Sequence, residues 1–318
     1  MLCRFVDPSA LPPGVPCYGS APWLGAVEQS VPLPLRVLAV EDEGRLLAWL
    51  PYHEVKRGPW KRALPLFIDT TGGPYFDLPS GLAFAEAERL KREIQKSLLG
   101  FLAEQVDFAT LCPLYSDPRA LPLEGDWRIS VRATARLDLD LDPPPWSSQA
   151  LRKLRKGANK GLKLEKRERF AHLEEAVENV RARHGIGHAS LDGAGLCALR
   201  EALSAKGLLD SWCVLDEGNN EVAYGLVAPD YSTSTLRFWY NLNTQAGLKL
   251  YASDFLFHGL AEAYRGRLRW FDLCGTDDAN LIEFKEKWAS ETLYSFALDY
   301  ARKPWMRHAL QAFSRLRR

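Results

Sequence analysis

The sequence has too few closely spaced cysteines to build a disulfide framework or a zinc site. Its six cysteines are scattered along 318 residues and never form a C-x-x-C pair. Structural zinc sites and small disulfide-stabilised domains bring cysteines together at short, regular intervals. We therefore expect reduced thiols, as in a cytosolic protein, and no metal site.

Long apolar runs are missing as well. No stretch approaches the roughly 18 apolar residues that a membrane-spanning helix needs. Residues 1–14 lack the apolar core of a signal peptide. These two absences predict a cytoplasmic protein that at most touches the inner face of the membrane from its surface.

Charge of one sign does not dominate. The chain has 41 basic and 40 acidic residues and a formal net charge of +1. A general binder of nucleic acids or membranes is therefore not expected, and any such partner must meet a local patch. The length suits two domains of about 100 to 200 residues each.

What the chain does contain is a repeated order of elements. Strand patterns at 36–41 and 45–55 flank an Asp-Glu-Gly turn, and a helix pattern at 84–105 leads into a strand pattern at 106–114. The second half is expected to hold helices at 170–184 and 191–207, strands at 211–218, 221–229 and 234–243, a helix at 251–266, a strand at 268–274, a short helix and a strand at 291–301. Its first two strands again flank an Asp-Glu-Gly turn. The shared order indicates a diverged internal duplication.

Three stretches carry a family resemblance: LRKLRKGANKGLKLE at 151–165, WFDLCGTDDANLIEFKEKW at 270–288 and the glycine-rich DTTGGPYFD at 69–77. In these stretches, and in the order of its second-half elements, the chain resembles the Fem family of peptidyltransferases, which duplicate the GNAT acyltransferase fold. The matching positions are Arg152, Lys156, Ala158 and Gly161 in the first stretch, and Phe271, Asp272, Gly275, Phe284, Lys285 and Trp288 in the second.

The resemblance implies an α/β fold of two tandem GNAT-like domains, with mixed, mostly antiparallel sheets flanked by helices. A proline-rich, acidic stretch at 115–128 is a candidate linker. We predict a degenerate N-terminal domain at 1–125 and a C-terminal domain at 126–318 that carries more of the recognisable machinery.

One stretch departs from the pattern of CoA-dependent enzymes. GNAT acetyltransferases hold the CoA pyrophosphate with a loop of the form Q/R-x-x-G-x-G/A, whose backbone N–H groups face the phosphates. The corresponding donor loop here contains Gln245, Gly247 and Leu248, but it is one residue short and ends in Leu250 instead of a small residue. We therefore expect no bound cofactor and an acyl donor used as a co-substrate. Family resemblance implies an aminoacyl-tRNA as the donor, and acyl-CoA is the alternative donor.

Amide formation needs a polarised carbonyl and a route for the departing proton. Lys285 could polarise the donor carbonyl, and the resemblance points to the same lysine. Asp272 could hold the amine or accept its proton, or simply cap a helix. Tyr240 could protonate the leaving group, or be a buried tyrosine. His258 sits among apolar helix residues and is interpreted as core packing.

Substrate-binding candidates are Arg152, Arg155, Lys156, Tyr75 and Asn241. The first three belong to a concentrated basic segment that could meet the phosphates of a substrate or of tRNA. A solvated helix face is the alternative. Residues 304–318 form a basic amphipathic pattern that could lie on an anionic membrane or dock on the protein itself.

The favoured function is a Fem-like N-acyltransferase. Its acceptor would be an amine of a cell-wall or glycan precursor, as in peptidoglycan or exopolysaccharide biosynthesis, of a lipid-linked molecule, or of a small molecule. The alternatives are an acyl-CoA-dependent GNAT N-acetyltransferase and a catalytically silent Fem-like binding module.

Overall fold

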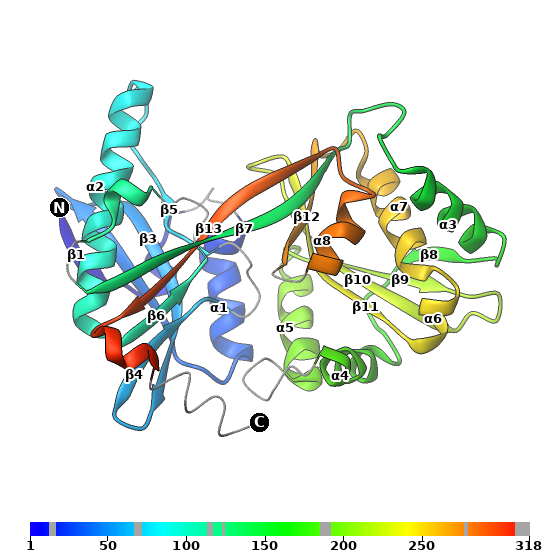
Figure 1. Ribbon diagram of the computed structural model, residues 1–318, viewed down its shortest axis with the longest axis horizontal. Helices are drawn as coiled ribbons and strands as arrows, with labels where there is room; N and C mark the ends of the chain where they lie inside the picture. Colours follow the sequence, from blue (N-terminus) through cyan, green and yellow to red (C-terminus); the bar gives the residue numbers. More distant parts are fainter. Residues whose placement is uncertain are drawn as a thin grey trace. The chain divides into compact units, whose positions relative to one another are not determined.

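The computed structural model describes residues 1–12, 17–66, 72–112, 117–122, 125–184, 192–276 and 279–308. They form two compact units (Figure 1). Unit 1 consists of Met1–Glu28, Pro32–Arg132 and the chain from Ser295 onward, and unit 2 consists of Gln29–Val31 and Ala133–Tyr294.

Unit 1 is built on a mixed sheet with the strand order β1-β2-β3-β4-β6-β13, to which β5 adds by pairing with β3. Its elements are β1 (Leu2–Phe5), α1 (Ala21–Ser30), β2 (Leu35–Asp42), β3 (Arg45–Arg57), β4 (Trp60–Leu64), β5 (Tyr75–Phe76), α2 (Phe84–Gln105), β6 (Phe108–Leu111), and the unit 1 parts of β7 (Asp126–Asp138) and β13 (Glu291–Ala301), with 3-10 turns at Pro8–Ala10, Cys17–Gly19 and Pro118–Ala120. Neighbouring strands are antiparallel except β4 and β6, which are parallel. The apolar face of α2 packs on this sheet through Ile94, Leu98 and Leu102.

The last strand is divided between the units: Glu291–Tyr294 belong to unit 2, and the strand from Ser295 onward belongs to unit 1. Antiparallel pairing joins β13 to β6, with Leu298 opposite Leu111 and Ala301 opposite Phe108. The helical residues that follow stay in this unit. Met306 is buried with Phe108 and Ala301, and Arg307 donates hydrogen bonds to Asp126. Residues 309–318 of the predicted tail helix lie outside the described residues.

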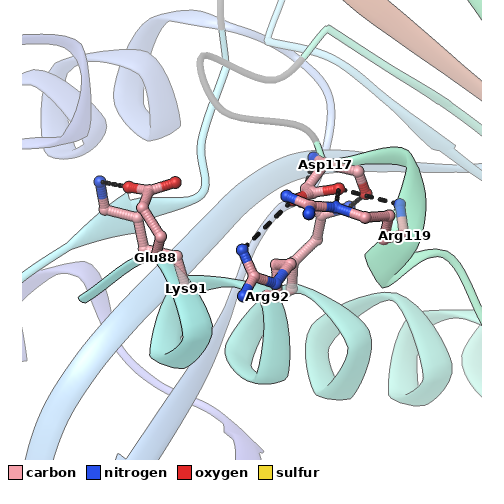
Figure 2. A network of polar contacts seen from close by, with 6 residues as sticks. Glu88, Lys91, Arg92, Asp117 and Arg119 are labelled. Carbon is pink, nitrogen blue, oxygen red and sulfur yellow. Dashed lines mark hydrogen bonds and ion pairs between the residues drawn. The ribbon is translucent and has the colours of Figure 1, made fainter. Parts of the chain in front are cut away.

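Part of the stretch predicted as a linker is tied to α2 (Figure 2). The Asp117 N–H donates to Gln95 Oε1 at 2.9 Å, and Gln95 Nε2 donates to the Asp117 carbonyl at 3.1 Å. The Asp117 carboxylate accepts hydrogen bonds from Arg119 and lies 3.6 Å from Arg92 Nη1. The Arg119 hydrogen bond lowers the pKa of Asp117 to about 2. These contacts hold residues 117–120 against the helix.

Unit 2 contains the sheet order β7-β12-β11-β10-β9-β8. Its elements are α3 (Ser148–Ala158), β8 (Lys163–Lys166), α4 (Leu173–His184), α5 (Gly193–Ala205), β9 (Asp210–Leu215), β10 (Glu221–Asp230), β11 (Thr235–Asn243), α6 (Gln245–Lys249), α7 (Ala252–Tyr264), β12 (Trp270–Thr276) and α8 (Ala279–Glu286). Among the described strand pairs of unit 2, only β11 and β12 are parallel neighbours, because the crossover through α7 returns the chain in the same direction. Helices α3 and α7 pack together, as do α4 and α5 (Figure 1).

The core of unit 2 lies between α7 and the sheet. Phe257 of α7 contacts Phe238 of β11 edge to face, with 4.8 Å between the ring centres. The ring of Phe271, on β12, lies 6.2 Å from the ring of Phe257. Trp288, just after α8, is fully buried and stacks on Phe257. The prediction of an α/β fold with mixed, mostly antiparallel sheets flanked by helices is confirmed.

Candidate functional site

The parallel strands β11 and β12 separate part-way along their length. Their pairing covers three residue pairs and ends at Arg237 opposite Asp272. Beyond that point β11 continues to Asn243 paired with β10, and β12 pairs with β7 through Gly275. The carboxyl ends of parallel strands are where open sheets commonly bind ligands, so this divergence is the natural place for a site.

Asp272 stands at the point of divergence, and both of its oxygens are engaged. Oδ1 accepts hydrogen bonds from the Thr134 hydroxyl at 3.0 Å and from the Cys274 N–H at 2.8 Å. Oδ2 accepts one from Arg237 Nη1 at 3.3 Å. The Asp272 side chain is buried. This arrangement fits a residue that organises the end of β12 better than one that is free to take a proton.

The backbone that Asp272 stabilises is unusual. Cys274 has a φ of 60° and lies in a register shift between β12 and β7. A non-glycine residue in the left-handed region is uncommon, and such positions cluster at functional sites. The hydrogen bond from the Cys274 N–H to Asp272 compensates part of this strain. The bulge turns the Cys274 carbonyl toward α8.

The Cys274 carbonyl accepts a hydrogen bond from Nζ of Lys285, on α8, at 2.8 Å. The lysine side chain is half-buried. Burial lowers the pKa of Lys285 because it disfavours the ammonium form, while Cys274 and the Asp272 carboxylate act in the opposite direction. The preceding Phe284 packs edge to face on Phe257, so the base of the lysine is anchored. The side chain of Leu281, expected beside Phe284, lies outside the described part.

Sequence reasoning missed the polar residues that support Asp272. Arg237 is buried, and its Nε lies 3.9 Å from Asp230 Oδ2, so its guanidinium stands between two carboxylates. The signal was present, because an arginine in the middle of the apolar strand TLRFWY needs a partner if the strand is central. The identity of that partner depends on strand pairing, which the sequence does not show.

The predicted residues Tyr240 and Asn241 directly follow a bulge in β11. Leu226 of β10 pairs with Tyr240 and Val227 with Phe238, so Trp239 is an extra residue. The bulge places Asn241 and Asn243 on the α7 side, where Asn243 Nδ2 donates to Ser253 Oγ at 2.7 Å and Asn241 Nδ2 at 3.3 Å. Alternation along the strand puts Tyr240 on the other side. The two predicted residues therefore do not share a face.

The predicted donor loop is the short helix α6. Its cap is Thr244, whose Oγ1 accepts the Gly247 N–H at 3.1 Å. Gly247 is buried, and a Cβ there would come within 2.0 Å of the Val222 carbonyl oxygen, so the glycine is required for packing. Gln245 and Leu248 are exposed. The Gly247 N–H is thus already occupied inside the protein.

The basic segment forms the outer face of α3. Arg152, Arg155 and Lys156 are exposed, whereas Ala150 and Gly157 are buried toward α7 and Leu250. Among the described residues, none of these three cations lies in an ion pair. Lys156 Nζ lies 5.5 Å from the ring centre of Tyr251, which precedes α7. The structure therefore brings the basic face next to the end of the donor loop.

Comparison with known proteins shows the fold. No protein-family model matches the chain, and a search of curated proteins gave no match. Among solved structures, FemX aligns with a TM-score of 0.59 at 11% identity over 90% of this chain and 92% of FemX. The fold is Fem-like. L-PGS from Bacillus licheniformis aligns at 0.56 with 14% identity over 92% of this chain and 91% of its own. The C-terminal domain of a candidate lysylphosphatidylglycerol synthetase from Agrobacterium fabrum aligns at 0.56 with 12% identity, covering 87% of each chain.

One predicted substrate-binding residue, Tyr75, lies in unit 1. Tyr75 is only 2% exposed in unit 1, where its ring lies 6.0 Å from Trp49 and packs against Gly19. His258 contacts Trp146 edge to face at 5.1 Å, in the packing role expected for it. In the described part of the chain, no group of three or more metal-binding side chains lies together, and no helix is long and apolar enough to cross a membrane.

Proposed function

We propose that the protein transfers an acyl or aminoacyl group to an amine. The observation that carries the proposal is the Lys285 Nζ held 2.8 Å from the Cys274 carbonyl, at the end of the strand that parts from β11. An ammonium group fixed at such a position can stabilise the negative charge that develops on a carbonyl oxygen under attack. The Fem-like fold supports the same class of reaction.

The amine nitrogen attacks the donor carbonyl carbon and forms the new C–N bond, while the bond from that carbon to the leaving oxygen or sulfur breaks. One proton passes from the amine to the leaving group. In this scheme Lys285 stabilises the oxyanion, Tyr240 supplies a hydroxyl for the leaving group, and Asp272 positions Cys274 and Lys285.

The donor that fits best is an aminoacyl-tRNA. Three exposed cations without ion-pair partners among the described residues lie on α3 beside the donor loop, and such a face gains affinity for phosphates. An acyl-CoA donor is the second candidate. It is disfavoured because the Gly247 N–H, which a pyrophosphate would need, donates to Thr244.

The acceptor is proposed to be an amine on a cell-wall or glycan precursor, a lipid-linked molecule or a small molecule. One fold neighbour is named for making lysylphosphatidylglycerol, so lipid acceptors belong in the screen. The basic tail is proposed to contact anionic membranes, and liposome flotation with and without residues 304–318 tests this.

Single-turnover transfer decides between the candidates. The protein is incubated with labelled aminoacyl-tRNA or labelled acetyl-CoA and a panel of amine acceptors, and the wild type is compared with Lys285→Met. Transfer from aminoacyl-tRNA that is lost in the variant supports the proposal. Transfer from acetyl-CoA would establish the second candidate. Ligand binding without turnover of any donor would establish a silent binding module.

A further inference from the structure

A cavity of about 210 Å³ lies between the start of α4 and the middle of α5 in unit 2, and the proposed function does not use it. It is lined by Arg169, Phe170, Leu173, Cys197, Arg200 and Glu201. At about 30 Å³ per water, the volume holds several water molecules or one small organic molecule. We propose that this cavity binds a small monocarboxylate through Arg200 and Arg169.

Arg200 is the main reason. The residue is 3% exposed, and two of its nitrogens are engaged. Nη1 donates to the Glu168 carbonyl at 2.5 Å, and Nη2 donates to Glu201 Oε1 at 3.0 Å. The buried Nε finds no acceptor among the described residues. Since Arg200 lines the cavity and its two hydrogen bonds use one N–H of each Nη group, the second N–H of these groups can be donated to a ligand oxygen.

The rim supplies a second cation. Arg169 is exposed, and in the described part of the chain it has no carboxylate partner. The three charged side chains of the lining, Arg169, Arg200 and Glu201, carry a net charge of +1. A singly charged carboxylate matches that charge, whereas a doubly charged phosphate would face Glu201 with excess negative charge.

The walls are preorganised and partly apolar. Glu221 Oε2 accepts the Ala171 N–H at 2.9 Å and the Tyr224 hydroxyl at 3.0 Å. This fixes the segment that carries Arg169 and Phe170 onto β10. The Phe170 ring packs on Tyr224 and lies 5.4 Å from the Arg200 guanidinium. With Leu173, it offers an apolar surface to the hydrocarbon part of a ligand such as butanoate or benzoate.

Cys197 makes the binding measurable. Cys3 and Cys197 are half-buried and the other four cysteines are buried, so maleimide labelling of a Cys3→Ser protein reports on Cys197. Butanoate and benzoate are expected to slow this labelling with saturation. Chloride at the same ionic strength should not slow it. Arg169→Gln should raise the apparent Kd about tenfold, the effect of one charge-assisted hydrogen bond.

The matched control is Arg89→Gln, an exposed arginine of α2 in unit 1, which should leave the Kd unchanged. Arg169 is on the surface, so its substitution does not endanger folding. Equal protection by chloride, or equal Kd values for the two variants, would overturn the proposal. Stronger protection by inorganic phosphate than by butanoate would overturn the assignment of a carboxylate. Since acyl transfer is not measured, the outcome is independent of the proposed function.

Discussion

Lys285 and Cys274 are joined by a hydrogen bond from the lysine Nζ to the backbone carbonyl of a residue with positive φ. Eleven positions separate the two residues in the chain. The contact links α8 to the bulged end of β12, so the lysine position depends on the strand conformation and on Asp272 beneath it.

Replacing Lys285 with methionine should preserve the fold and reduce kcat/KM for transfer by about 10²-fold, the scale of losing one oxyanion donor. Lys287→Met is the matched control, because Lys287 pairs only loosely with the exposed Glu283 at 3.9 Å. Single-turnover transfer and thermal unfolding measure both variants. Equal losses in the two, or none in either, would remove Lys285 from the mechanism.

Asp272→Asn should lower the free energy of unfolding by about 3 kcal/mol, because the buried Arg237 loses a charged partner. The amide oxygen can still accept the Cys274 N–H, so the bulge should persist. Asp140→Asn, at an exposed position, should change the stability little. Urea unfolding provides the comparison. A variant as stable as the wild type would show that the buried pair contributes nothing.

The basic face of α3 should determine the salt dependence of tRNA binding. Replacing Arg152, Arg155 and Lys156 with alanine should weaken binding and reduce the slope of log K against log salt by about 2 to 3, if each contacts phosphate. The control replaces the exposed cations Arg89, Lys96 and Lys206. Filter binding of unfractionated tRNA over a salt series measures both proteins. An unchanged slope in the folded α3 variant would leave this surface as a solvated face.

His53 should make unit 1 sensitive to acid. The ring is buried in β3, and this burial lowers its pKa from 6.5 to about 4. Between these values the unfolded chain binds a proton that the folded chain excludes, so stability is complete above pH 6.5 and falls as the pH approaches 4. The loss should reach about 3 kcal/mol at 1.36 kcal/mol per pKa unit. His53→Leu should remove this part of the pH dependence. Urea unfolding at several pH values gives the free energy of unfolding as a function of pH. If that free energy falls equally steeply with decreasing pH in both proteins, His53 is not the source of the acid sensitivity.

Local patterns were sufficient to predict many elements of the fold. The helix predicted at 84–105 and the strand predicted at 291–301 have the same bounds in the structure, because a long helical period and a run of β-forming residues are properties of adjacent residues. Phe284 and Lys285 are neighbours on α8, and the side chains of helix neighbours point about 100° apart. One anchors in the core while the other is directed elsewhere.

Tertiary structure decided what those residues touch. Asp272 meets Arg237 from 35 positions away and Thr134 from 138 positions away, through strand pairing that no local pattern specifies. The extra residue Trp239 in β11 shifted the side-chain alternation, so that Asn241 lies on the α7 side of the sheet, as Phe238 does. Gly247 resembled a phosphate-binding glycine in sequence, but the close approach of the Val222 carbonyl explains its presence. Sequence alone determined where many of the elements lie and which residue types they carry. The pairing of distant strands determined which side chains face each other, because register is set by contacts across the whole sheet.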